Sequence, residues 1–285
     1  MSTTPFQSLA CPLDGQPLSL ASGAWRCAAG HSFDIAKQGH VNLLPVQQKR
    51  SVDPGDSKAM VAARQRFLGA GHYQVIADAV SAAALEGTSE NEPLTCLDAG
   101  CGEGYYLRRL AQASDVALSL MGLDISKWAV LAAARQSRPP SPALDICWAV
   151  GSNASLPVQS QTLDRVLCMF GFPVASEFER VLKPGGVWLQ VEAGPEHLRE
   201  LREIIYPELK APRANDAPTP AGFEHASTRR ISDRLTLESA EEIADLLAMT
   251  PHLYRASSEG RERAQALETL TLTIDVVIKR WVKAG

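Results

Sequence analysis

The chain has 285 residues, a formal net charge of −4 and an apolar content of 45%, which are values of a globular protein with a substantial core. It contains no charge-poor apolar run of membrane-spanning length, and residues 1–10 lack the basic start and apolar core of a signal peptide. We therefore expect a cytoplasmic protein without a membrane partner. The acidic balance also excludes a general polyanion binder, so any contact with nucleic acid must come from local basic clusters.

Residues 11–45 predict a unit of short strands and turns that is too small to bury a core alone. Cys11, Cys27 and His31 have the chemistry of zinc ligands, and such a staple often stabilises a small unit. Asp14 stands where zinc ribbons usually have another cysteine, and its carboxylate can also bind zinc. We call this unit, residues 11–45, the knuckle. Two interpretations of it stay open, namely a zinc site formed by these four residues or a degenerate knuckle without metal. A disulfide between the two cysteines is less compatible with the cytoplasm.

A polar, turn-rich segment, residues 47–57, is expected to link this unit to two helices near 57–68 and 74–85. Within this segment, Lys49 and Arg50 could contact phosphate or could simply be solvated.

The central segment of the sequence is Leu97–Asp98–Ala99–Gly100–Cys101–Gly102–Glu103–Gly104, which follows a strand-like run and precedes a helix. A strand, a glycine-rich turn and a helix form the nucleotide-binding start of a doubly wound α/β sheet. Asp98 and Glu103 suit a cationic ligand better than a pyrophosphate. A further acid, Asp124, ends the next apolar run and suits the hydroxyls of a ribose. Glycines and acids without a phosphate-holding lysine predict S-adenosylmethionine as the cofactor.

Strand and helix patterns alternate after this turn, as expected for a parallel sheet. Strands are expected near 94–99, 117–123, 144–150, 163–169 and 187–193, and helices near 104–113, 127–136, 175–182, 196–206 and 238–249. Residues 211–228 indicate a loop, and strict alternation over 269–279 predicts a last, antiparallel strand. The glycine turn, Asp124 and the turn Leu182–Lys183–Pro184–Gly185–Gly186 resemble motifs of class I methyltransferases. This resemblance implies an α/β fold with a doubly wound, mostly parallel, seven-stranded Rossmann-like methyltransferase sheet and a small N-terminal zinc-knuckle domain.

The loops after the later strands carry further candidates. In class I methyltransferases an acid often contacts the adenine amine, and here Ser152, Asn153 or the backbone must do so. Phe170, Phe172 and Pro173 follow the fourth strand, where acceptor bases usually lie, and could stack on a base or pack in the core.

The whole chain resembles the bacterial large-subunit (23S) ribosomal RNA (guanine-N1)-methyltransferases. The matching phrases, in order, are HSFDIAKQGHVNLLPVQQKRSVDPGDS, FLGAGHY, LDAGCGEGYY, GLDISK, LKPGG, GPEHL and LLAMTP. This resemblance implies cofactor contacts at Tyr73, Gly102, Glu103 and His197. It implies zinc ligands at Cys11, Cys27 and His31, whereas the family's second cysteine ligand falls on Asp14.

The same resemblance implies methyl transfer from S-adenosylmethionine to N1 of a guanine in a hairpin of the large-subunit RNA. It divides the chain into an RNA-recognition domain (1–48), a linker and helix (49–72) and a methyltransferase domain (73–285), and it leaves a homodimer open. Guanine N1 lies on the Watson–Crick edge, so the base must be unpaired or extruded, and its proton must be removed. Glu192 and His197 are candidate bases, although either could be structural.

Two other functions compete with this one. A small-molecule methyltransferase would share the sheet but has no use for the knuckle. A non-catalytic protein that binds S-adenosylmethionine and RNA would keep the fold but would not need the complete set of glycines and acids.

Overall fold

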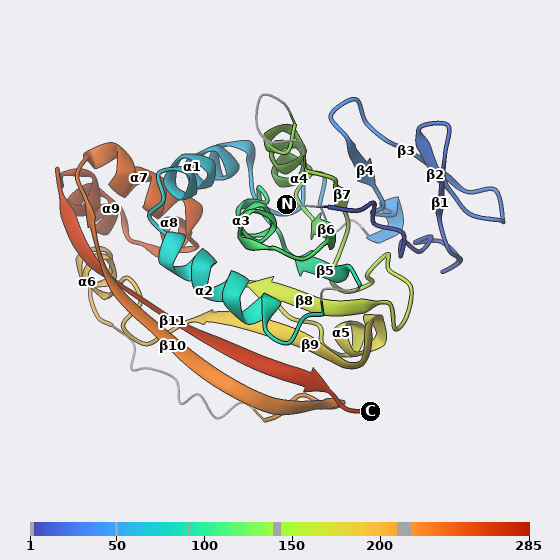
Figure 1. The fold of residues 1–285 in the computed structure, drawn as a ribbon. Coiled ribbons are helices and arrows are strands. Elements are labelled where there is room, and N and C mark those ends of the chain that lie inside the picture. The colour runs from blue at the N-terminus through green and yellow to red at the C-terminus, as the bar shows by residue number, and fades with distance from the viewer. Residues whose placement is uncertain (1–2, 49–50, 90–91, 139–143, 210–217) are drawn as a thin grey trace.

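The computed structural model describes residues 3–48, 51–89, 92–138, 144–209 and 218–285 (Figure 1). Lys49, Arg50 and residues 211–217 of the expected loop therefore lie outside the described residues. A small antiparallel sheet is formed by β1 (Ser19–Ala21), β2 (Ala24–Arg26) and β3 (Ser32–Asp34). These short strands and their turns confirm the small unit expected near the N-terminus.

The second sheet has the order β10-β11-β9-β8-β5-β6-β7-β4. Its strands are β4 (His40–Asn42), β5 (Leu94–Ala99), β6 (Leu118–Asp124), β7 (Ile146–Val150), β8 (Leu163–Met169), β9 (Leu182–Ala193), β10 (Phe223–Leu237) and β11 (Leu270–Lys283). Strand β11 is antiparallel to both of its neighbours, and the strands from β9 to β4 pair in parallel. The expected mostly parallel sheet and its antiparallel C-terminal strand are confirmed.

The described sheet has eight strands rather than the expected seven, because β4 from the knuckle region joins its edge. His40 lies opposite Trp148 of β7, and the Leu43 N–H donates to the Val150 carbonyl at 2.9 Å. Three residues are too few to show a strand pattern in the sequence, so only the pairing with β7 defines this strand.

The expected loop over 211–228 is wrong for residues 223–228, which begin strand β10. Most side chains of β10 are exposed on both faces, so its sequence lacks the alternation that marks a half-buried strand. Its conformation comes from the long ladder with β11, in which Phe223 pairs with Lys283 and Leu237 with Leu270.

One face of the sheet is covered by helices α2 (Gln74–Leu85), α3 (Tyr105–Ala113) and α4 (Lys127–Gln136), whose buried residues form one continuous apolar core with those of β5, β6 and β9. Helix α1 (Lys58–Gly69) lies over α3 and α4 and packs against α7 (Ala240–Met249). Ser57 and Ser126 begin α1 and α4 by accepting hydrogen bonds from N–H groups three residues on.

The other face is covered by α5 (Ala175–Val181) and by the N-terminal segment. Phe6 and Leu9 are almost completely buried in this second core, which also includes Phe178 and Trp188. The Ala10 N–H donates to the Pro157 carbonyl at 2.9 Å, so the chain just before the knuckle is held against the loop between β7 and β8.

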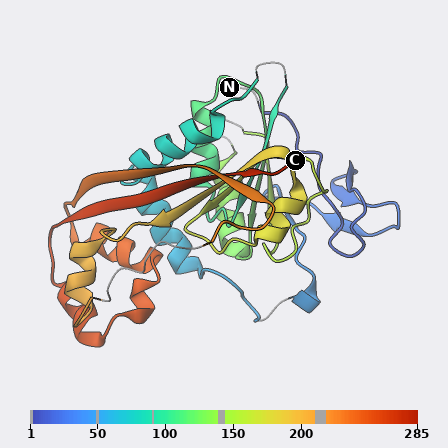
Figure 2. The same cartoon turned by 90° about the horizontal axis from the view of Figure 1, so that it is seen from below.

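The remaining helices α6 (Arg199–Ile205), α8 (His252–Arg255) and α9 (Ser258–Gln265) gather with α7 at one end of the long β10–β11 pair. The knuckle lies at the opposite end of the molecule (Figures 1 and 2). Two short elements complete the fold, the 3-10 helix η1 (Val46–Gln48) after β4 and the turn that joins α1 to α2. Across the described ranges, no helix is both long and apolar enough to cross a membrane.

Candidate functional site

The glycine-rich turn after β5 forms the centre of the site. Gly100, Gly102 and Gly104 all have positive φ angles, 98°, 55° and 82°. The Gly100 N–H donates to the Leu123 carbonyl at 2.8 Å, which fastens the turn to the end of β6. A Cβ atom on Gly104 would lie 2.4 Å from Cη2 of Trp148, so no larger residue fits there. The turn therefore needs its glycines both for backbone conformation and for close packing.

Asp98, the last residue but one of β5, has a completely buried carboxylate, 0% exposed. Neither of its oxygens has a hydrogen-bond partner among the described residues. Burial, together with the negative charges of Asp124 and Glu103, raises the pKa of Asp98 to about 8. Buried polar atoms are nearly always paired, so two orphan oxygens point to a donor that the protein itself does not provide.

The two neighbouring acids are partly engaged by the backbone. Asp124 accepts hydrogen bonds from the Gly102 N–H at 2.9 Å and from the Ser126 N–H at 2.7 Å. Glu103 accepts from the Tyr105 N–H at 3.1 Å, and burial raises the pKa of both acids. Since each carboxylate oxygen can accept more than one hydrogen bond, Asp124 can hold the turn and still bind a hydroxyl.

Arg64 is a residue of this site that the sequence did not indicate. It reaches from α1 to the turn, where a Cβ atom on Gly102 would lie 3.4 Å from its Nη1. Its guanidinium pairs with Asp56 and donates to the Met249 carbonyl at 3.1 Å. No local signal could have revealed it, because only the packing of α1 over α3 and α4 brings Arg64 to the turn.

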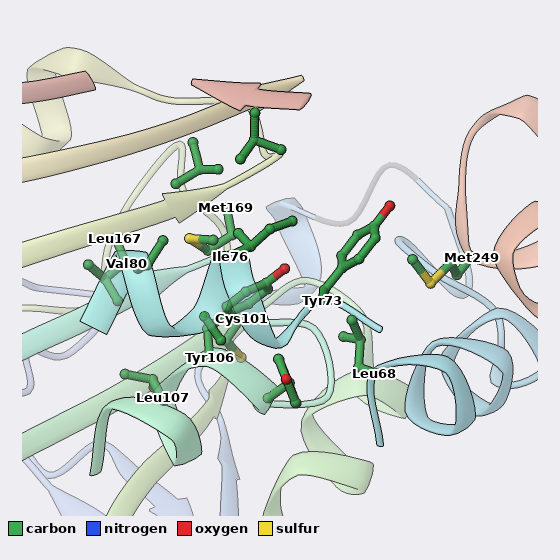
Figure 3. Close-up of a cluster of buried hydrophobic side chains, with 14 of the residues drawn as sticks. Leu68, Tyr73, Ile76, Val80, Cys101, Tyr106, Leu107, Leu167, Met169 and Met249 are labelled. Carbon is green, nitrogen blue, oxygen red and sulfur yellow. The ribbon is translucent and has the colours of Figure 1, made fainter. Parts of the chain in front are cut away.

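Tyr73 and His197 lie in contact, although they are distant in the sequence. The Tyr73 hydroxyl lies 3.3 Å from Nε2 of His197, while Nδ1 of His197 accepts the Asp275 N–H at 3.2 Å. Burial lowers the pKa of His197 to about 4, so the ring is neutral and carries its proton on Nε2. Figure 3 shows Tyr73 projecting away from Ile76 and Val80 of α2.

The loop after β8 adds two aromatic rings. Phe170 has a positive φ of 53° and stacks on His197, with ring centroids 5.8 Å apart and an angle of 23°. Phe170 is 40% and Phe172 91% exposed, so neither side chain is part of the core. Asn153 fixes this loop, since its Nδ2 donates to the Ala99 carbonyl at 3.2 Å and to the Phe172 carbonyl at 3.4 Å.

The structure thus places the predicted cofactor residues at the carboxyl ends of the parallel strands or at the start of α2. The acids gather around the glycine turn, Tyr73 contacts His197, and Asn153 lies beside the end of β5. Ser152 follows β7, and its hydroxyl accepts the Ala154 N–H at 3.2 Å. Of the two candidate bases, His197 has both nitrogens engaged, and Glu192 pairs with Lys279 at 2.8 Å.

The four predicted metal ligands converge in the knuckle. Nδ1 of His31 lies 3.5 Å from Sγ of Cys11, 3.4 Å from Sγ of Cys27 and 3.0 Å from Oδ2 of Asp14. All four donor atoms lie within 4.8 Å of one another. Both cysteines are free thiols, so the disulfide alternative is not formed.

This donor set fits zinc, which prefers four sulfur, nitrogen or oxygen ligands in a tetrahedral arrangement. The two carboxylate oxygens of Asp14 make different contacts. Oδ1 accepts the Gln16 N–H at 3.0 Å and holds the turn, while Oδ2 faces the other three donors. One carboxylate oxygen can therefore occupy the position of the missing thiolate.

Comparisons with known proteins agree with both parts of this geometry. A zinc-ribbon family model described as "RlmA, N-terminal" matches residues 9–52, and a model described as "Methyltransferase domain" matches residues 96–186. The chain is 35% identical to a protein of Micromonospora griseorubida that is provisionally named a 23S rRNA (guanine-N1)-methyltransferase, over 96% of each chain.

A further curated relative is similar over nearly its whole length. The 23S rRNA (guanine(748)-N(1))-methyltransferase of Streptomyces fradiae is 30% identical over 95% of this chain and 96% of its own. Among solved structures, phosphoethanolamine N-methyltransferase 2 of Haemonchus contortus is 14% identical. It covers 80% of this chain and 58% of its own, with a TM-score of 0.47.

Proposed function

Because the chain belongs to the family of 23S rRNA (guanine-N1)-methyltransferases, we propose that it transfers a methyl group from S-adenosylmethionine to N1 of a guanine in a hairpin of large-subunit ribosomal RNA. The observation that carries the proposal is the Asp98 carboxylate, whose two buried oxygens lack partners among the described residues. S-adenosylmethionine carries an ammonium and a sulfonium group, and a cation of this kind would supply the missing partner beside Gly100 and Gly102.

The rest of the cofactor site follows from the geometry around Asp98. Asp124 would accept the ribose hydroxyls, and Tyr73 and His197 would line the methionine end. The Nδ2 group of Asn153 is engaged by two carbonyls, so its amide oxygen or the Ser152 hydroxyl would accept the adenine amine.

S-adenosylmethionine supplies an activated methyl group when it is bound, so the protein must chiefly align guanine N1 with that group. Phe170, which stacks on His197, would provide the aromatic ring on which the extruded guanine stacks. His197 would orient Tyr73 and Phe170 rather than take the N1 proton, because both of its nitrogens are engaged and burial lowers its pKa to about 4. Glu192 remains the carboxylate candidate for proton removal.

The knuckle would recognise the RNA, and zinc would hold its four ligands together. This assignment keeps the expected division into residues 1–48, 49–72 and 73–285. It is supported by exposed apolar side chains on the knuckle, Leu13 at 54% and Leu20 at 59%. We infer a cytoplasmic location because ribosomal RNA is the substrate, and the homodimer stays a prediction.

The test is methyl transfer with labelled S-adenosylmethionine to total RNA and, in parallel, to a metabolite extract. We expect label in large-subunit RNA and a primer-extension stop at one guanine, because N1 methylation blocks base pairing. Transfer only to small molecules, or to another base atom, would contradict the proposal. Binding of the cofactor without transfer to either mixture would favour the non-catalytic alternative.

A further inference from the structure

The most exposed aromatic side chain among the described residues is Phe172, at 91%. Burying a phenylalanine side chain contributes about 1.5–3 kcal/mol to the free energy of unfolding. The exposed Phe172 ring makes little of this contribution. Its exposure is not the result of a loosely held loop. Asn153 donates to the carbonyl of Phe172, and the preceding Phe170 N–H donates to the Val191 carbonyl at 2.9 Å.

The loop around Phe172 has little freedom to fold the ring inward. A Cβ atom on Gly171 would lie 3.2 Å from Sγ of Cys168, so the backbone runs close over the end of β8. Phe170 adopts a left-handed conformation that non-glycine residues rarely take, and such conformations cluster at functional sites. The held backbone therefore exposes the Phe172 ring to solvent, two residues after Phe170 in the same loop.

The substrate chemistry explains what such a ring can do. Guanine N1 is reached only after the base leaves its stack, which costs unstacking energy. Proteins that open a base stack often insert an apolar side chain into the step that opens. Resting on the proposed function, we propose that Phe172 enters the RNA stack at the position the target guanine vacates, while the guanine rests on Phe170.

Other exposed apolar residues provide a matched control. Val52 is 92% exposed and lies near the start of α4, because its neighbour Asp53 pairs with Lys127. Val52 is as exposed as Phe172, but it lies in the linker rather than in the loop after β8. Loss of a general apolar contact with RNA would therefore affect Val52→Ala and Phe172→Ala alike, whereas loss of a wedge would affect only Phe172→Ala.

The test compares single-turnover methylation of two RNAs, the hairpin mapped by primer extension and the same hairpin with abasic residues on both sides of the target guanine. Phe172→Ala should lower the rate on the unmodified hairpin about tenfold or more, the range of aromatic–base stacking. The decrease in the methylation rate of Phe172→Ala should be much smaller on the abasic RNA, because no base stack has to be opened there. Phe172→Leu should retain more activity than Phe172→Ala, because leucine can also enter an opened base step although it cannot stack as an aromatic ring does. Val52→Ala should match the wild type on both RNAs.

A second measurement follows extrusion directly. With 2-aminopurine at the target position and S-adenosylhomocysteine present, the wild type should raise the fluorescence and Phe172→Ala should not. Equal losses on the two RNAs, an equal loss in Val52→Ala, or no loss on the unmodified hairpin would overturn the wedge. If the wild type itself places no methyl on guanine N1 in either RNA, the proposed function fails, and the wedge fails with it.

Discussion

At the residue scale, the site is dominated by three carboxylates that lie close together at the ends of β5 and β6. Glu103 and Asp124 accept backbone N–H groups, which compensate part of their burial. Asp98 has no such compensation among the described residues, and its pKa rises to about 8. The buried, unpaired carboxylate of Asp98 destabilises the ligand-free protein. A cationic ligand that pairs with this carboxylate would remove that cost and so bind more tightly.

Asp98→Asn should therefore stabilise the ligand-free protein and weaken its binding of S-adenosylmethionine. In the unfolded chain the carboxyl ionises near its ordinary value of 3.8, but in the folded protein it ionises only near 8. The wild type should thus lose stability relative to Asp98→Asn as pH rises from about 4 to about 8. Thermal unfolding across this range and calorimetry at pH 7 measure the two effects.

The same shift predicts proton release when the cofactor binds to the wild type near pH 7. Calorimetry in buffers with different ionisation enthalpies should show this release, and Asp98→Asn should not show it. If the two proteins have parallel stability profiles and equal affinity, Asp98 does not face the cofactor.

At the scale of elements, the knuckle consists of two parts with different supports. Strands β1, β2 and β3 are short, and all four predicted metal donors lie outside them, Cys11 and Asp14 before β1 and Cys27 and His31 between β2 and β3. Strand β4 is instead part of the large sheet through β7. The metal site and the large sheet therefore stabilise different segments of residues 11–45, which the sequence pattern predicted as one unit.

Removal of zinc by a chelator should accordingly loosen residues 11–34 but leave β4 protected. A small unit takes much of its folding energy from its metal, whereas β4 keeps its hydrogen bonds to β7. Hydrogen exchange with and without chelator distinguishes the two segments, and cofactor binding should survive while RNA methylation falls.

Asp14→Cys serves as the matched variant, because a thiolate is a softer ligand and should bind zinc more tightly. A folded knuckle with full activity in chelator, and no metal by elemental analysis, would mean that packing alone holds residues 11–34.

At the scale of the whole molecule, the segment that joins the knuckle to α1 lies against the end of β6. Ser126 Oγ donates to the Asp56 carbonyl at 2.7 Å, and Asp56 also pairs with Arg64 beside the glycine turn. A Cβ atom on Gly55 would lie 2.8 Å from Cγ2 of Ile125. Gly55 and Asp56, which precede α1, are therefore held against the chain beside the glycine turn by packed contacts.

Gly55→Ala should lower both the thermal stability and the affinity for S-adenosylmethionine. Its φ of +81° is strained for alanine, by about 1–2 kcal/mol, and overpacking against β6 should add about 1–3 kcal/mol. Gly87→Ala is the control, since its φ is +72° but nothing lies within 4 Å of its Cβ position. Equal stability losses and unchanged cofactor affinity in both variants would show that the Gly55 contact is unimportant.

The sequence by itself predicted the features that depend on neighbouring residues. The glycine turn, the helices that begin after Ser57 and Ser126, and the strands β5 to β9 all carry short-range patterns of turn residues and apolar periodicity. The four metal donors could also be identified, because their chemistry and spacing are visible in the residues themselves.

Only the tertiary structure revealed the features that depend on distant contacts. Arg64 reaches the turn through the packing of α1, β4 exists because β7 pairs with it, and β10 is a strand through its ladder with β11. The exposed ring of Phe172 likewise depends on Asn153, which holds its backbone. Contacts between residues far apart in the chain leave no periodicity in the sequence, so they become visible only once the chain has folded.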